Sequence, residues 1–168
     1  VPDDVVAQGK TAAAELTSDS KASLQQLYAS VPLAKALGPK AQAILVFPKV
    51  TKAGLGIGGQ YGEGTLLQKG AAVAYYKTTG ASFGLQAGGQ QYGYAMIFMN
   101  AKALEQLDNK EGFEVGVGPS VVLVDEGLAK TTTTTTLKDD IYAFVFGQKG
   151  LMAGLGIQGN KITRITPK

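Results

Sequence analysis

The stretch AILVFPKVTKAGLGIGGQYG, residues 43–62, decides the fold, because a short apolar run gives way there to regularly spaced glycines. The run AILVF has the length of a buried strand. The glycines at positions 54, 56 and 58 would leave one face of an extended strand without side chains, so that another element could approach closely. Leu55 and Ile57 would then share the opposite face. The stretch therefore predicts strands of a β core to which Leu55 and Ile57 belong.

The rest of the chain continues this pattern of short apolar runs separated by glycine. The runs are TLLQKG, AAVAYYK, ASFGLQAGG and YGYAMIFM, followed later by FEVGVG, SVVLV, IYAFVF, MAGLGIQG and KITRI. Runs of this length, bounded by turn residues, are typical of successive strands. The pair Gly159-Asn160, between two such runs, predicts a tight hairpin turn.

Helical patterns occur at the start of the chain and once in its middle. Apolar residues between positions 24 and 31 follow helical spacing, and Ser20 is expected to cap this helix. A second, short helix over residues 33–37 is expected to end at Gly38-Pro39. Asn100 is expected to cap a mid-chain helix.

These elements predict an α+β fold with a glycine-rich, mainly antiparallel β core that is barrel-like or strongly curved. The length suits one domain. Residues 1–32 are expected to form a helical segment packed on a β-rich domain of residues 33–168. The sequence from residue 43 also resembles YAFVFGQKGLMAGLGIQG from residue 142, which predicts a pseudo-symmetric core closed by its two ends.

Two segments match the pattern G-x-G-x-x-G, at residues 54–59 and 154–159. A dinucleotide site needs a helix opening at the third glycine and an acidic residue about 20 positions later. After residue 59 the chain reads QYGEG, a turn signal, and no acidic residue stands near Thr79. We interpret both segments as glycine-spaced strands.

Residue composition argues against an enzyme. The chain contains neither Cys nor His, which excludes disulfides, Ser-His-Asp and Cys-His machinery and the common zinc sites. The carboxylate pairs Asp125-Glu126 and Asp139-Asp140 would point to opposite faces of a strand, so we interpret them as turn or edge residues. We predict no catalysis, no cofactor and no metal.

Charge is distributed in blocks along the chain. Residues 20–62 carry five Lys and no acid, and residues 141–168 carry four basic residues and no acid. This predicts a basic face that attracts anionic lipid, nucleic acid or acidic protein. Nucleic acid is disfavoured, because Arg occurs once and no aromatic residue is interleaved with the basic segments in the manner of a stacking platform. No run approaches the roughly 20 apolar residues that a membrane-spanning helix needs.

Several blocks in fixed order resemble the SYLF domain family, which occurs in bacterial exported proteins and in eukaryotic proteins that link lipids to actin. The resemblance covers residues 33–165. The blocks are LAKAL, AILVFPKVTKAGLGIGGQYGEGTLL, SFGLQAGGQQYGYAMIFMN, Gly118-Pro119 and GLMAGLGIQG.

This resemblance implies binding of phosphoinositide or another acidic phospholipid at a membrane surface, and no reaction. The positions that match are Leu33, Lys35, Leu37 and Lys40 in the short helix, with Lys49 and Lys52 after the first strand. Such lysines would meet lipid phosphates while Leu33 and Leu37 enter the interface. The resemblance also implies a periplasmic or outer-membrane exported protein or lipoprotein whose signal has been removed. The alternative function is an envelope scaffold or surface antigen that acts through protein contacts.

Overall fold

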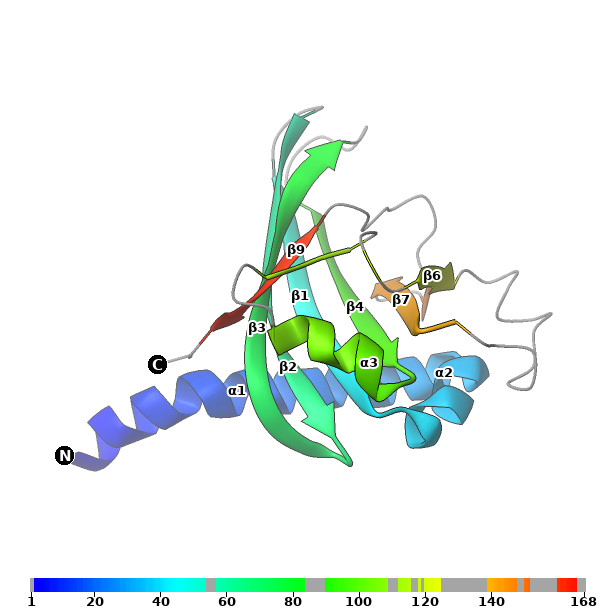
Figure 1. Cartoon of the computed structure of the whole chain (residues 1–168). Coiled ribbons are helices and arrows are strands. Elements are labelled where there is room, and N and C mark those ends of the chain that lie inside the picture. The colour runs from blue at the N-terminus through cyan, green and yellow to red at the C-terminus, as the bar shows by residue number, and fades with distance from the viewer. Residues whose placement is uncertain are drawn as a thin grey trace.

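A curved β-sheet runs through the middle of the computed structural model, with helices on both of its faces (Figure 1). The structure describes residues 2–53, 57–83, 90–108, 112–115, 118, 120–124, 139–147, 150–151 and 160–165. For residues 2–12, 52–53, 57–58, 81–83, 90–91, 147 and 150–151 it describes the backbone alone.

The helices lie before the first strand and after the fourth. They are α1 (Pro2–Ser30), α2 (Pro32–Leu37), the 3-10 turn η1 (Gly38–Lys40), α3 (Ala101–Leu104) and the 3-10 turn η2 (Glu105–Asp108). The strands are β1 (Ala43–Ala53), β2 (Ile57–Gln68), β3 (Ala71–Phe83), β4 (Gln90–Phe98), β5 (Phe113–Glu114), β6 (Val121–Val124), β7 (Ile141–Gly147), β8 (Gly150–Leu151) and β9 (Lys161–Ile165).

The described strands form one nine-stranded sheet in the order β5-β9-β3-β2-β1-β4-β7-β6, with β8 paired to β7. Among the described pairs, only β6 with β7 is parallel. The predicted α+β class and the mainly antiparallel, strongly curved sheet are therefore confirmed. The predicted closure of the core by its two ends is not seen among the described strands, where β5 and β6 form the edges of the sheet and the two similar segments, β1 and β7, lie on either side of β4.

Strand β1 crosses the centre of the sheet although it contains a proline. Pro48 has no N–H to donate to a neighbour, and the register of β1 shifts on both sides of it, between Val46 and Lys49 toward β2 and between Phe47 and Val50 toward β4. A bulge of this kind accommodates a proline and bends the strand.

Glycines on both neighbouring strands lie against this bulge. A Cβ atom added to Gly62 would lie 2.9 Å from the Lys49 carbonyl oxygen, and one added to Gly93 would lie 3.1 Å from the Pro48 carbonyl oxygen. Only a residue without a side chain lets the backbones approach this closely. Gly62 and Gly93 thus have the close-approach role that the sequence suggested for the two G-x-G-x-x-G segments, which themselves lie largely outside the described residues.

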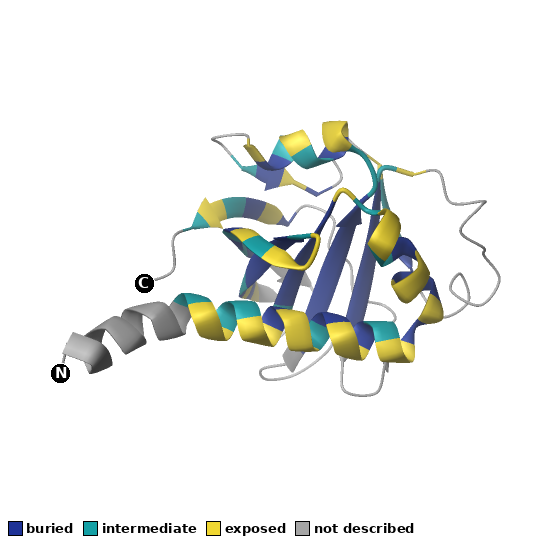
Figure 2. Cartoon of the chain, turned by 90° about the horizontal axis from the view of Figure 1, so that it is seen from below, coloured by how far each residue is buried: buried dark blue, intermediate teal, exposed yellow. Residues whose placement is uncertain are grey.

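The sheet buries apolar side chains on both faces, which produces two cores. The first core lies on the face covered by α3 and η2 and contains Phe47, Tyr94 and Met96. The second core lies on the face covered by α1 and α2, where Leu27 packs with Phe144 and their neighbours. Figure 2 shows the buried strands between these two layers.

Helix α1 runs without a break through most of the predicted helical segment of residues 1–32, and the predicted cap at Ser20 was wrong. Ser20 lies inside the helix and is fully buried, and its hydroxyl donates to Thr65 Oγ1 at 3.0 Å. A polar residue inside the helix therefore contacts β2 instead of ending the helix. The cap at Asn100 is confirmed, because its side chain accepts a hydrogen bond from the Ala103 amide at 2.7 Å.

The close approach at Gly64 gives a test of the curved sheet. A Cβ atom there would lie 2.3 Å from the Val46 carbonyl oxygen and 2.7 Å from Phe47 Cδ1. We expect Gly64→Ala to lower the free energy of unfolding by about 2 kcal/mol or more, because β1 and β2 would have to separate. Urea denaturation measures this change.

The matched control is Gly59→Ala on the same strand, where the nearest atom, the Gly80 carbonyl oxygen, is at an ordinary 3.8 Å. This variant should unfold at nearly the wild-type urea concentration. Equal midpoints for the two variants would contradict the close packing of β2 on the bulge.

Candidate functional site

Helix α2 separates the residues that the sequence grouped as a lipid site. Lys35 is exposed, and so is Lys40 in the following turn. Leu33 and Leu37 are only 5% and 1% exposed, and both pack in the core beneath α1 and α2. Their side chains do not project from the surface in this conformation, so the lysines alone face the solvent.

A third exposed lysine belongs to the same helical layer. Lys21 is exposed on α1, seven residues before Tyr28, so the two side chains share one flank of the helix. The Tyr28 hydroxyl lies over Gly38, at the place where a Cβ atom would be. This flank of α1 therefore faces α2 and η1. We call Lys21, Lys35 and Lys40 the helical lysine surface, and Figure 2 shows the exposed outer side of these helices.

Lys49 belongs to a different surface. It lies on β1, six residues beyond Ala43, which places it roughly 20 Å from the start of the strand. It is exposed, and Glu63 on β2 is its partner in register, followed by Lys77 on β3. An acid thus stands between the two lysines. For Lys52 the structure describes the backbone alone.

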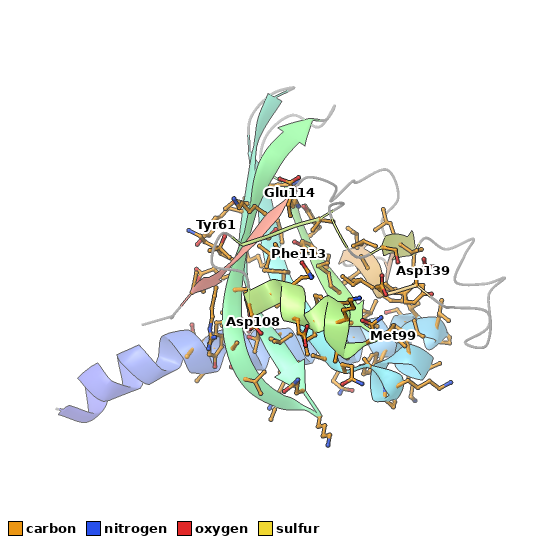
Figure 3. The ribbon with its side chains drawn as sticks, in the orientation of Figure 1. Tyr61, Met99, Asp108, Phe113, Glu114 and Asp139 are labelled. Atoms are coloured by element: carbon orange, nitrogen blue, oxygen red, sulfur yellow. The ribbon has the colours of Figure 1, made fainter. Side chains whose placement is uncertain are left out.

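The next row of the same sheet face carries an exposed aromatic residue. Tyr61 is 49% exposed, and its register partners are Thr51 on one side and Thr79 on the other. Lys161 pairs with Thr79 and in turn faces Glu114 on β5. Figure 3 labels Tyr61 and Glu114 in this part of the sheet. We call Lys49, Lys77 and Lys161 the strand lysine group; its charges are partly offset by acids.

The sequence did not identify Lys21 and Lys77 as site residues. The signal for Lys21 was helical spacing, since it lies on the same flank as Tyr28. Lys77 joins Lys49 only through the register of three strands, which no local pattern specifies.

A cluster of polar side chains lies inside the curved sheet, on the face away from α1. Gln60 Nε2 donates to Asn160 Oδ1 at 2.9 Å, and the Tyr92 hydroxyl donates to Gln60 Oε1. The Tyr94 hydroxyl donates to Thr78 Oγ1 at 2.6 Å. Asn160 Nδ2 is buried and finds no hydrogen-bond partner in the described part of the chain. We call these five residues the interior polar cluster.

Burial makes both tyrosines of this cluster weaker acids than an exposed tyrosine. It raises the pKa of Tyr92 to about 12 and raises the pKa of Tyr94 further still, although the hydrogen bond to Thr78 lowers the latter in part. Both phenols therefore stay protonated at neutral pH and act as hydrogen-bond donors.

Asp140 joins three segments of the chain through hydrogen bonds. Its carboxylate accepts from Asn100 Nδ2 at 2.7 Å and from the Ser120 amide at 3.0 Å. These hydrogen bonds hold the pKa of Asp140 below its usual range. The neighbouring Asp139 accepts from the Tyr142 hydroxyl at 3.4 Å. Asp139 and Asp140 thus have separate structural partners, whereas Asp125-Glu126 lies outside the described residues.

No helix among the described residues is long and apolar enough to cross a membrane. No group of three or more carboxylates among them is arranged to hold a metal ion.

Burial of Tyr92 in the interior polar cluster should lower the free energy of unfolding at alkaline pH. The folded state keeps the Tyr92 proton that the unfolded state releases near pH 10. The contribution of protonated Tyr92 to the free energy of unfolding is therefore complete below pH 10 and is lost as the pH rises toward 12. The loss reaches roughly 3 kcal/mol for this residue. Urea midpoints at pH 8, 9.5 and 11 should fall less steeply for Tyr92→Phe than for the wild type.

Tyr61→Phe is the matched control, because that phenol is half exposed. It should retain most of the wild-type pH dependence. A wild-type midpoint that does not change between pH 9.5 and 11 would contradict the burial of the two phenols.

Comparison with known proteins shows the family to which the chain belongs. The model of the family described as Ysc84, Las17-binding protein actin regulator, matches residues 79–166, which is more than half of the chain. A comparison with curated proteins found no match. The matched region runs from β3 to the end of β9 and does not include the helical lysine surface. The chain belongs to this family of SYLF domains.

Proposed function

We propose that this protein binds acidic phospholipid at a membrane surface through the helical lysine surface, and that it catalyses no reaction. The family is related to lipid binding and to the regulation of actin, which supports a general role in binding lipid. The observation that supports the finer proposal is the exposure of Lys21, Lys35 and Lys40 on α1, α2 and η1, the helical elements that precede the sheet.

The charge of this layer favours an anionic surface. From residue 20 to residue 62, which includes the last part of α1, α2 and η1, the chain contains five Lys and no acidic residue, although Glu15 and Asp19 precede Lys21 on α1. Each lysine near an anionic membrane contributes about 1 kcal/mol, so three give weak, reversible binding. Salt should weaken this binding, because exposed charges are screened over a Debye length of about 8 Å at physiological ionic strength.

The buried leucines determine the depth of binding. Leu33 and Leu37 hold α2 on the second core, and their removal from it would expose apolar surface. We therefore propose that the protein rests on the head groups and does not insert these side chains. This replaces the interfacial role that the sequence suggested for the two leucines.

The strand lysine group is less suited to the same contact. Lys49 and Lys77 lie on the sheet surface, beside Glu63. A helix with its side chains is about 10–12 Å thick, so the outer side of α1 stands above the sheet by more than the Debye length. A flat membrane that touches α1 and α2 would therefore act weakly on Lys49 and Lys77.

The double variant Lys21→Gln, Lys35→Gln tests this proposal. We expect it to bind vesicles of phosphatidylglycerol and phosphatidylcholine about thirtyfold more weakly than the wild type, because two contributions of about 1 kcal/mol are lost. Co-sedimentation over a series of vesicle concentrations measures the change. Vesicles of phosphatidylcholine alone should bind neither protein.

Lys49→Gln, Lys77→Gln is the matched control, since it removes the same charge from the strand lysine group. It should bind anionic vesicles within about threefold of the wild type. Equal losses in the two double variants, or equal wild-type binding to neutral and anionic vesicles, would refute the helical lysine surface as the site.

A protein partner is the second candidate function, and the description of the matched family as Las17-binding actin regulators favours it. An envelope scaffold or surface antigen would be of this kind. Failure of the wild type to bind either type of vesicle would favour the protein-partner function over lipid binding.

We further propose that the protein works outside the cytoplasm, in the periplasm or at the outer membrane, as an exported protein or lipoprotein. Osmotic-shock fractionation of cells that make the native protein tests this. The protein should be released with a periplasmic marker or sediment with outer membranes, whereas recovery with a cytoplasmic marker would show the proposed location to be wrong.

A further inference from the structure

A groove with an apolar floor opens on the sheet face opposite to α1 and α2. Its volume is about 320 Å³. Strands β2 and β3 form the floor with Leu66, Ala74 and Tyr76, and α3 with η2 forms one wall with Leu104 and Leu107. Figure 1 shows α3 in front of β3, on the other side of the sheet from α1.

One apolar side chain at the mouth of this groove is open to solvent. Val73 is 47% exposed, and the residues described around it leave it without a cover. An exposed valine beside a hollow with an apolar floor is a surface that an apolar chain would stabilise by removing it from water.

Charges of both signs line the same groove. Arg164 on β9 is the register partner of Tyr76, and Glu105 and Asp108 come from η2. Burial raises the pKa of the Tyr76 phenol, while the nearby Arg164 lowers it in part and Asp108 raises it further. Figure 3 labels Asp108 beside β3. The groove thus combines an arginine and two carboxylates around a single phenol.

The Tyr76 side chain belongs to the first core and also lines the groove. The residue is 2% exposed, and its ring adds apolar surface to the floor. An apolar chain that lies on this floor would remove the remaining exposed apolar surface from water.

We propose that this groove binds one acyl chain of a zwitterionic phospholipid of the phosphoethanolamine type. The chain lies on the apolar floor, Arg164 binds the phosphate, and Glu105 with Asp108 bind the ammonium group. Arginine suits phosphate because its planar guanidinium donates two parallel hydrogen bonds. The volume is near the lower end of ligand pockets, roughly 300–1,000 Å³, which suits one chain and not two.

Because the rim of the groove carries charges of both signs, it should bind a zwitterionic lipid more tightly than a purely anionic lipid. A fatty acid or lysophosphatidic acid would satisfy Arg164 but would place its negative charge near two carboxylates. Only a head group with both charges matches both sides of the rim. This site does not depend on the helical lysine surface, which lies on the other face of the sheet.

The test titrates the full chain with lysophosphatidylethanolamine below its micelle concentration and follows amide chemical shifts by NMR. We expect shifts around Val73, Tyr76 and Leu104. Arg164→Gln should weaken binding by about tenfold or more, because a charge-assisted hydrogen bond is lost. Lys161→Gln, on the same strand but the opposite face, should leave the affinity unchanged.

The double variant Glu105→Gln, Asp108→Asn gives a second, independent readout. The wild type should prefer lysophosphatidylethanolamine to lysophosphatidic acid of the same chain length, and this variant should reverse the preference. Ala101→Trp, which fills the mouth from an exposed helix position, should block both lipids.

Three results would overturn the proposal: shifts outside the groove only, equal affinities for Arg164→Gln and Lys161→Gln, or an unchanged lipid preference in the double variant. Lys21→Gln, Lys35→Gln serves to separate the two sites, since it should keep groove binding while losing anionic vesicles.

Discussion

The bend of β1 at Pro48 is the constraint on which the rest of the structure depends. A proline in the central strand cannot complete the hydrogen-bond ladder, so the register shifts on both sides of it. Gly62 and Gly64 on β2 let the neighbouring backbone follow this bend, because a Cβ atom at either would collide with β1, and Gly93 on β4 allows a close approach to the Pro48 carbonyl oxygen. The curvature of the sheet thus depends on one proline and on the glycines beside it.

A curved sheet buried on both faces gives the protein two different surfaces. The face under α1 and α2 is closed by leucines such as Leu27 and Leu37, and exposed lysines lie on the outside of these helices. The other face is only partly covered, because α3 and η2 are short. A groove remains there, with Arg164 at its edge. In our account the first surface meets a membrane and the second holds a single lipid.

Local patterns in the sequence predicted the fold class, most strands and the Asn100 cap, because alternation, glycine spacing and capping depend on neighbours in the chain. They failed where the partner is distant. Ser20 resembles a cap, but it contacts Thr65 in the sheet. The helix that carries Lys35 could turn its leucines toward a membrane or toward its own core, and spacing alone does not distinguish the two. The groove was not predicted, since Tyr76 and Arg164 meet only through the pairing of β3 with β9.

The orientation of the protein on a membrane is the central claim, and spin-label accessibility measures it most directly. The native chain contains no cysteine, so single-cysteine variants label cleanly. Ala36 on α2 and Ala101 on α3 are both exposed and lie on opposite sides of the sheet. On anionic vesicles, a label at position 36 should become shielded from a water-soluble relaxation agent, whereas a label at position 101 should remain accessible. Shielding at position 101 with continued access at position 36 would contradict the account.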